Sequence, residues 1–360
     1  MSVSMSQTIG YQYLGGRDGR EDECTELQPP YQNFIDPFDR SYDPYWPEAE
    51  LVEAVNLAID LNMPLLLEGE PGCGKTRLAG AIAYEFTQRH LPGKIIQEEG
   101  KVLGQEWWPY YVWNVKSIGR AKDGLYEFDA VLRLRDAQIF GTDPVKMKDY
   151  LGDTESEAIK ARLLDKSKYV NYGPLGKAFQ EPFYRPVILI DEIDKADSDF
   201  PNDLLFELDR MGFEVPEAGI PFKKAVHNPI IIITSNRERP LPEAFLRRCL
   251  YFCLDFPQEN QLRDILNRRF SAQLMGQPEL VDQAIAKFLE MRVTLKGMPG
   301  SKPPGTSEIL RFMEMLLRQS KDRAQEILNT LEKQSPFLGI LLKTQQDQAR
   351  YLKSNSGRQS

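Results

Sequence analysis

A glycine-rich loop between a short apolar run and a helical pattern constrains this chain more than any other feature. The loop, GEPGCGKT at residues 69–76, fits the pattern G-x-x-x-x-G-K-[ST]. Residues 63–68 before it have the length of a buried strand, and residues 77–89 after it have helical spacing. Such glycines let backbone N–H groups converge at the start of a helix, which creates an anion site. The sequence therefore predicts a strand–loop–helix unit that binds phosphate.

The polar positions of this loop have separate candidate roles. The Lys75 ammonium can reach the β- and γ-phosphates of a nucleotide, and the Thr76 hydroxyl can bind Mg²⁺. Cys73 is interpreted as a small side chain that the loop tolerates, with a redox switch as the less favoured interpretation. The residues predicted to contact the nucleotide here are Gly69, Glu70, Pro71, Gly72, Cys73, Gly74, Lys75, Thr76 and Arg77.

The rest of the chain predicts an α/β core followed by helices. Further short apolar runs occupy residues 109–115, 187–191, 230–235 and 250–254, with helical patterns between them. Apolar strands that alternate with helices favour a parallel sheet covered on both faces. After Pro257 the pattern is only helical, so we expect a domain boundary near Phe256 and Pro257.

Polar side chains follow two of the predicted strands. Asp191 and Glu192 come directly after one apolar run, and the carboxyl ends of parallel strands line the ligand crevice of an open sheet. Asp191 is predicted to hold Mg²⁺, and Glu192 to orient an attacking water, as γ-phosphate transfer requires. Asn236 ends the next strand. In the functional interpretation, Asn236 forms a hydrogen bond with that water or with the γ-phosphate. In the structural interpretation, asparagine is present because it suits a turn.

Two adjacent arginines, Arg247 and Arg248, precede the last predicted strand. Arginines at a helix end are commonly solvated or paired with the last carbonyls of the helix. The functional alternative is an arginine donated to the γ-phosphate of a neighbouring subunit, because charge builds on the transferring oxygens.

The composition limits the classes of partner. With 45 basic and 53 acidic residues the net charge is −8, which gives no support to a nucleic acid held by bulk charge. No stretch approaches the ~20 apolar residues of a membrane-spanning helix, and residues 1–10 lack a signal-peptide pattern. The 4 cysteines have neither a disulfide-framework nor a zinc spacing. We expect a reduced, cytoplasmic protein without membrane insertion.

Taken in order, these elements resemble the AAA+ ATPases over residues 46–320. More narrowly, the chain resembles the MoxR-like (AAA_5) branch through LEGEPGCGKT at 67–76, LIDEIDKA at 189–196, LLFELDRMGFEV at 204–215 and LPEAFLRRC at 241–249. Many NTPases share the first two of these sequence motifs, whereas the last two indicate the MoxR-like branch.

The resemblance implies a P-loop NTPase fold, an αβα sandwich with a five-stranded parallel sheet, followed by a small α-helical lid domain. With the composition it divides the chain into a flexible arm at 1–45, a nucleotide-binding core at 46–256, a lid at 257–345 and a polar tail at 346–360. Residue by residue, Lys75 and Thr76 match Walker A, and Asp191 and Glu192 match Walker B. Asn236 matches sensor 1, and Arg248 best matches the arginine finger, with Arg247 as second choice.

One family motif is altered in this chain. Relatives place an arginine in the lid two residues after a serine, but here Ile309 occupies that position after Ser307. Arg311, two residues later on the same predicted helix, is the remaining candidate for a lid arginine that contacts nucleotide.

The resemblance further implies a function. It implies hydrolysis of Mg²⁺-bound ATP at the subunit interfaces of a ring, usually a hexamer. It also implies chaperone-like remodelling of a protein partner, with a von Willebrand factor A domain protein as the typical companion. An alternative is a nucleotide-gated scaffold or switch in a signalling or defence complex, against which the Asp191–Glu192 pair argues. A nucleic-acid motor or loader is the weakest alternative because of the acidic net charge.

Overall fold

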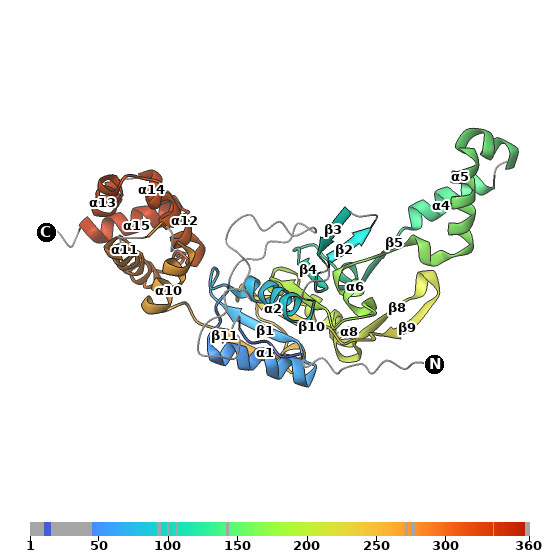
Figure 1. The fold of residues 1–360 in the computed structure, drawn as a ribbon, viewed down its shortest axis with the longest axis horizontal. Helices are drawn as coiled ribbons and strands as arrows, with labels where there is room; N and C mark the ends of the chain where they lie inside the picture. Colours follow the sequence, from blue (N-terminus) through green and yellow to red (C-terminus); the bar gives the residue numbers. More distant parts are fainter. Residues whose placement is uncertain are drawn as a thin grey trace. The chain divides into compact units, whose positions relative to one another are not determined.

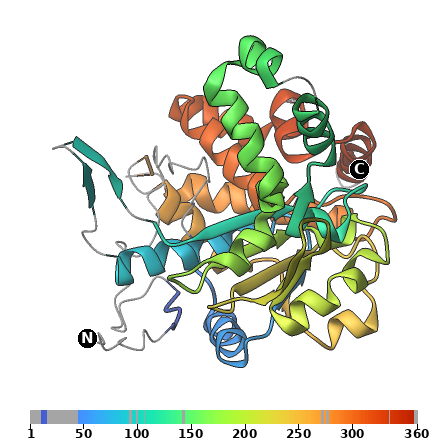
Figure 2. The same ribbon diagram turned by 90° about the vertical axis from the view of Figure 1, so that its right-hand side faces the viewer.

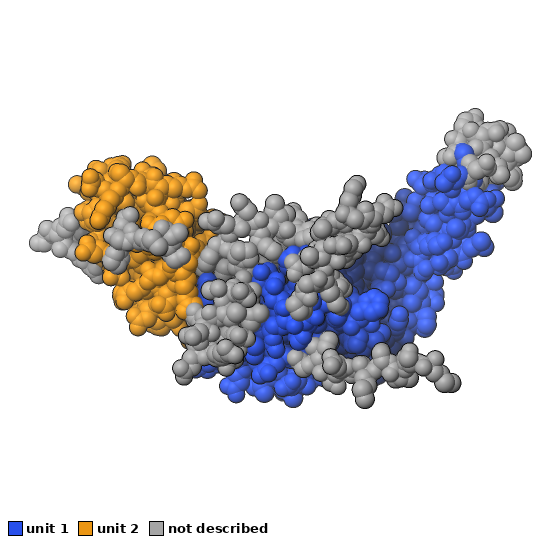
Figure 3. Space-filling model, viewed as in Figure 1, with its two compact units in different colours: residues 1–68, 76–253 blue, residues 69–75, 254–360 orange. Residues whose placement is uncertain are grey.

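The computed structural model describes residues 11–15, 45–91, 95–98, 101–105, 107–141, 144–270, 273–274, 278–333 and 335–356. The chain divides into two compact units, which are coloured separately in Figure 3. Unit 1 comprises residues 1–68 and 76–253, and unit 2 comprises residues 69–75 and 254–360. Most of the predicted N-terminal arm lies outside the described residues.

Unit 1 is built on the five-stranded parallel sheet that the sequence predicts. The strands are β1 (Leu65–Gly69), β4 (Tyr110–Asn114), β7 (Val187–Asp191), β10 (Ile230–Ser235) and β11 (Leu250–Leu254). Their order is β11-β1-β10-β7-β4. The inner strands β1, β7 and β10 consist mainly of buried apolar residues because a parallel sheet is covered on both faces, whereas the edge strand β11 is only partly buried. The expected P-loop NTPase α/β fold is confirmed.

Side chains from alternate positions of these strands enter the core on opposite faces of the sheet. One face carries a cluster that includes Ile188, Ile190, Ile231 and Ile233. The intervening Leu189 is equally buried, so helices or loops cover both faces.

Helices and small antiparallel strand pairs surround the sheet (Figure 1). In the sequence, Phe213, Val215 and Phe222 flank turns that contain Pro and Gly, which predicts a β-hairpin at 211–226. The pair β8 (Gly212–Val215) and β9 (Ile220–Lys224) confirms this hairpin. Two further pairs are β2 (Ile95–Glu98) with β3 (Lys101–Gln105), and β5 (Tyr126–Phe128) with β6 (Val170–Tyr172). The helices of this unit are α1 (Ala49–Leu61), α2 (Lys75–His90), α3 (Ala121–Leu125), α4 (Ala130–Phe140), α5 (Pro144–Leu164), α6 (Pro174–Gln180), α7 (Phe200–Asp203), α8 (Leu205–Arg210) and α9 (Glu243–Leu246).

Helices α4 and α5 form a pair that stands away from the five-stranded sheet, as both ribbon views show (Figures 1 and 2). They lie within residues 116–185, a long region between the second and third predicted strands that resembles an insertion and whose sequence pattern does not define its elements. From here on, 'the arm' means this α4–α5 helix pair and not the predicted N-terminal arm at 1–45.

Unit 2 contains a helical domain with its own core. Its helices are α10 (Glu259–Arg269), α11 (Pro278–Lys296), α12 (Thr306–Leu317), α13 (Lys321–Asn329), α14 (Ser335–Leu341) and α15 (Gln345–Ser356). The sequence predicts a polar tail from residue 346, but α15 is a regular helix. The reason is Tyr351, whose side chain is fully buried in the core of this unit.

Candidate functional site

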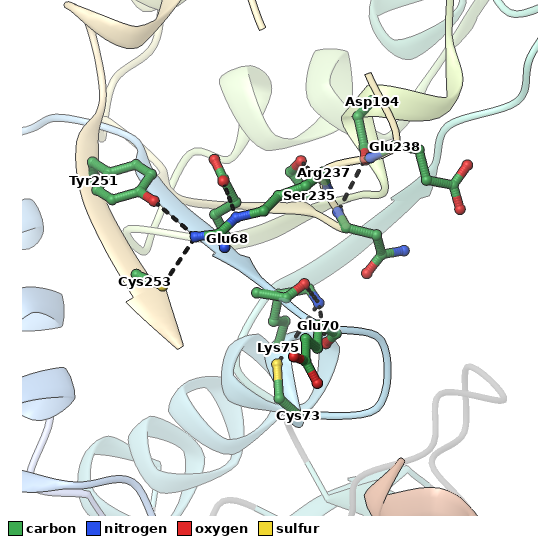
Figure 4. Close-up of polar contacts among 12 residues, drawn as sticks. Glu68, Glu70, Cys73, Lys75, Asp194, Ser235, Arg237, Glu238, Tyr251 and Cys253 are labelled. Carbon is green, nitrogen blue, oxygen red and sulfur yellow. Dashed lines mark hydrogen bonds and ion pairs between the residues drawn. The ribbon is translucent and has the colours of Figure 1, made fainter. Parts of the chain in front are cut away.

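The predicted phosphate loop connects the end of β1 to the start of α2. Gly72 and Gly74 have φ angles of 82° and 95°, which residues with a Cβ rarely adopt, so glycine is required at both positions. The Lys75 ammonium is buried and donates hydrogen bonds to the carbonyl oxygens of Gly69 at 2.8 Å and Glu70 at 2.9 Å (Figure 4). Burial raises the pKa of the Cys73 thiol. A thiol is less reactive than its thiolate, which opposes a redox role.

The acidic strand end lies in unit 1 and is organised around Asp191. The Thr76 hydroxyl donates to Asp191 Oδ1 at 3.0 Å, and the Thr234 hydroxyl donates to the same oxygen at 2.7 Å. Thr234 Oγ1 in turn accepts the backbone N–H of Glu192 at 2.8 Å. Thr234 is not among the site residues that the sequence predicts. The signal that could have found it is the parallel pairing of β10 with β7. The two strands end at the same edge of the sheet, so a polar residue at the end of β10 lies beside the acidic end of β7.

Both carboxylate oxygens of Glu192 have partners. Asn236 Nδ2 donates to Oε1 at 2.9 Å, and the Lys195 ammonium pairs with Oε2. The hydrogen bond to Glu192 raises the pKa of Lys195. Glu192 has a φ of 57°, and such left-handed backbone in a non-glycine residue stores strain that functional sites often carry. Asn236 is therefore a partner of Glu192 rather than only a turn residue.

Asp194 and Arg237 support this edge of the sheet and were not among the predicted site residues. Buried Asp194 accepts the backbone N–H groups of Asn236 at 3.1 Å and Glu238 at 2.8 Å. Figure 4 shows Arg237 beside Glu68, with which it forms an ion pair. The Arg237 guanidinium also donates to Tyr251 Oη at 3.3 Å and Cys253 Sγ at 3.1 Å.

The remaining predicted arginines have different environments. Arg248 Nε donates to both carboxylate oxygens of Asp209, at 2.9 and 2.7 Å, and Arg248 also donates to the Ala244 carbonyl. Arg247 is 74% exposed and pairs with Glu243 one helical turn away. Arg77 on α2 and Arg311 on α12 are exposed.

The side chains and backbone at this site are chemically suited to bind a nucleotide together with Mg²⁺. The hydroxyl of Thr76 and the carboxylate of Asp191 are hard oxygen ligands, which Mg²⁺ prefers, and they already lie within 3.0 Å of each other. The loop supplies the turned backbone and the lysine that polyphosphate recognition requires. A bound Mg²⁺ would use Thr76 and Asp191 and would neutralise charge on the phosphates.

A parallel α/β sheet with this loop and a Thr76–Asp191 pair defines a P-loop nucleotide-binding protein. The model of the ATPase family associated with various cellular activities (AAA) matches residues 65–254, which is more than half of the chain. The chain therefore belongs to the AAA family, whose members in general bind ATP and Mg²⁺, hydrolyse nucleotide and assemble into rings. No curated protein sequence matches the chain. Among the helices described, none combines the length and apolar character that crossing a membrane demands.

Proposed function

We propose that this protein is an ATPase of the MoxR type, in which Gly69–Lys75 hold the triphosphate of ATP and Thr76 and Asp191 hold Mg²⁺. The observation that carries this proposal is the fixation of Glu192 by Asn236 at 2.9 Å, next to the metal-binding Asp191. A carboxylate held at this strand end can orient a water for attack on the γ-phosphate. Catalysis then consists of positioning and electrostatic stabilisation without a covalent intermediate.

The proposal extends to an assembly. We propose a cytoplasmic ring, hexameric as in most relatives, in which Arg248 reaches the nucleotide of the neighbouring subunit. Arg248 is favoured over Arg247 because Asp209 holds its guanidinium in a fixed orientation, whereas Arg247 is largely exposed. Hydrolysis in this ring would remodel a protein partner, with a von Willebrand factor A domain protein as the proposed companion.

The first test replaces Glu192. We expect Glu192→Gln to bind Mg²⁺-ATP with the affinity of the unaltered protein and to lose phosphate release, because the amide cannot polarise water. Lys75→Ala should lose binding itself. ATP binding by calorimetry and phosphate release per subunit are the measurements. Normal turnover by Glu192→Gln would remove this residue from its role. Tight binding with no turnover in the unaltered protein would favour the nucleotide-gated scaffold.

The second test addresses Arg248. An Arg248→Ala protein should bind ATP but hydrolyse it at least about tenfold more slowly, since an arginine that stabilises the transferring phosphate contributes strongly to the rate. Mixing it with Lys75→Ala subunits should restore part of the activity if the arginine acts on a neighbour. The same loss in Arg247→Ala, with Arg248→Ala unaffected, would move the role to Arg247.

A further inference from the structure

An arginine in the helical domain occupies a position where an apolar side chain is expected. The buried positions of α11 recur at helical spacing and include Phe288, Met291 and Leu295, and Arg292 falls on this same stripe. Arg292 is 6% exposed, and in the described part of the chain it is the single buried arginine. Burial of a guanidinium is costly unless the charge is paired and hydrogen-bonded, so its partners identify its role.

The partners of Arg292 include the phosphate loop. Its guanidinium donates to Glu70 Oε2 at 2.6 Å, and Glu70 is the second residue of the loop. Arg292 also donates to the Pro304 carbonyl and lies 3.3 Å from the centre of the Phe256 ring. One helical turn later, the Lys296 ammonium pairs with Glu70 Oε1 at 3.0 Å. Both oxygens of the loop carboxylate are therefore held by cations of α11.

The same loop residue is connected to the phosphate-binding lysine. The Glu70 carbonyl accepts a hydrogen bond from Lys75 Nζ at 2.9 Å, while the Glu70 side chain is held by Arg292. The loop also packs closely on the start of α12, because a Cβ added to Gly72 would lie 3.2 Å from the Gly305 Cα. A displacement of Glu70 would therefore disturb the backbone around Lys75.

The charge of Glu70 explains why two cations are needed. A carboxylate inside a loop that binds a triphosphate would repel the ligand unless it is neutralised. Partial burial raises the pKa of Glu70, but the hydrogen bonds and charges of Lys296 and Arg292 outweigh this and lower it overall. Glu70 is therefore ionised at neutral pH, and its neutralisation depends on α11.

We propose that Arg292 is a positioning residue for nucleotide binding, which acts through Glu70 by neutralising the loop carboxylate and tying the loop to α11. This inference rests on the proposed binding of ATP at the loop. It also accounts for the altered lid motif, since Ile309 is fully buried in the helical core and Arg311 is exposed. Arg292, from a different helix, links the lid to the nucleotide loop.

A double-mutant cycle tests the proposal on the full chain. The dissociation constant of Mg²⁺-ATP is measured by calorimetry for the unaltered protein, Arg292→Gln, Glu70→Gln and the double variant. We expect Arg292→Gln to weaken binding about tenfold while Glu70 is present, because it leaves a carboxylate unpaired beside the phosphates, and to have no further effect in the Glu70→Gln background. The double variant should return to the affinity of Glu70→Gln. Arg318→Gln is the matched control, because Arg318 forms an Arg–Glu pair of the same 2.6 Å length in the same unit and is exposed.

Each outcome supports or overturns the proposal. Rescue by Glu70→Gln supports it, whereas a double variant as weak as Arg292→Gln, or an Arg292→Gln protein that binds normally, overturns it. If Arg292→Gln does not fold, Lys296→Glu replaces it, since Lys296 is 68% exposed. That variant should bind ATP more weakly and be rescued by Glu70→Gln, and unchanged binding would overturn the proposal. Failure of the unaltered protein to bind ATP would instead refute the proposed function.

Discussion

At the scale of single residues, Thr234 decides how the two carboxylates are arranged. Its buried hydroxyl donates to Asp191 and accepts the N–H of Glu192. The first bond orients the proposed metal ligand, and the second supports the left-handed backbone of Glu192. One hydroxyl thus couples the residue that would hold Mg²⁺ to the residue that would orient water.

Replacing Thr234 by valine keeps the shape of the side chain and removes both hydrogen bonds. We expect the free energy of unfolding to fall by about 1–3 kcal/mol, because buried polar groups lose their partners. ATP hydrolysis should fall at least about tenfold through misplacement of Asp191 and Glu192. Chemical denaturation and phosphate release measure the two effects. Thr234→Ser, which keeps the hydroxyl, should retain most activity, and equal hydrolysis by the valine variant would contradict this role.

At the scale of elements, the arm is held by a polar network. Asp136 on α4 is fully buried and accepts hydrogen bonds from Arg162 Nε at 2.7 Å and Tyr169 Oη at 3.0 Å. The hydrogen bond from Arg162 on α5 is the main cause that lowers the pKa of Asp136. Several apolar side chains of the arm are exposed, namely Val131, Leu134, Phe140 and Leu164. The packing of α4 on α5 therefore depends strongly on this charged contact.

The arm should respond to pH through Asp136. Because its pKa is lowered in the folded state, ionised Asp136 stabilises the arm above its ordinary pKa of about 4, and this contribution is lost as the pH falls below that value. We expect Asp136→Asn to destabilise the arm by about 1–3 kcal/mol at neutral pH and to flatten its acid response. Hydrogen exchange of peptides from α4 and α5 between about pH 7 and about pH 2.5, a range that extends below the ordinary pKa of the carboxyl group, measures both after correction for intrinsic rates. Unchanged protection in the variant would show that the network is dispensable.

At the scale of the whole molecule, two hydrophobic cores divide the chain. The core of unit 1 includes the sheet residues Ile188 and Ile231, and the core of unit 2 includes Phe288, Phe312 and Tyr351 of the helical domain. Because each unit buries its own apolar side chains, damage to one core should be confined to that unit. Sub-global opening of such cooperative units is common in proteins.

Truncation of Phe312 tests this independence. Phe312 is fully buried on α12, and we expect Phe312→Ala to lower the stability of the helical domain by about 3–5 kcal/mol through the cavity it leaves. Amides of α11 and α12 should exchange faster, while those of β7 and β10 keep their protection. Hydrogen exchange with mass spectrometry resolves the segments, and equal loss of protection in both units would show a single cooperative structure.

The sequence predicts the sheet of the core better than it predicts the elements outside the sheet. The sequence predicts the sheet strands and the hairpin at 211–226 because apolar runs and turn residues are local patterns. Residues 116–185 have weak patterns, from which their helices and strands are not predictable. The arm is held by Asp136, Arg162 and Tyr169, whose partnership is not visible from their spacing.

The sequence by itself determines the phosphate loop, the acidic and polar residues at the ends of the apolar strands, and the helical character of the C-terminal region. These features depend on residues that are neighbours in the chain, such as the glycines at 72 and 74. Only the tertiary structure decides that Thr234 joins Asp191 to Glu192 and that Arg292 holds Glu70. These contacts join residues far apart in the chain, and a hydrogen bond forms only where the fold brings donor and acceptor within about 3 Å.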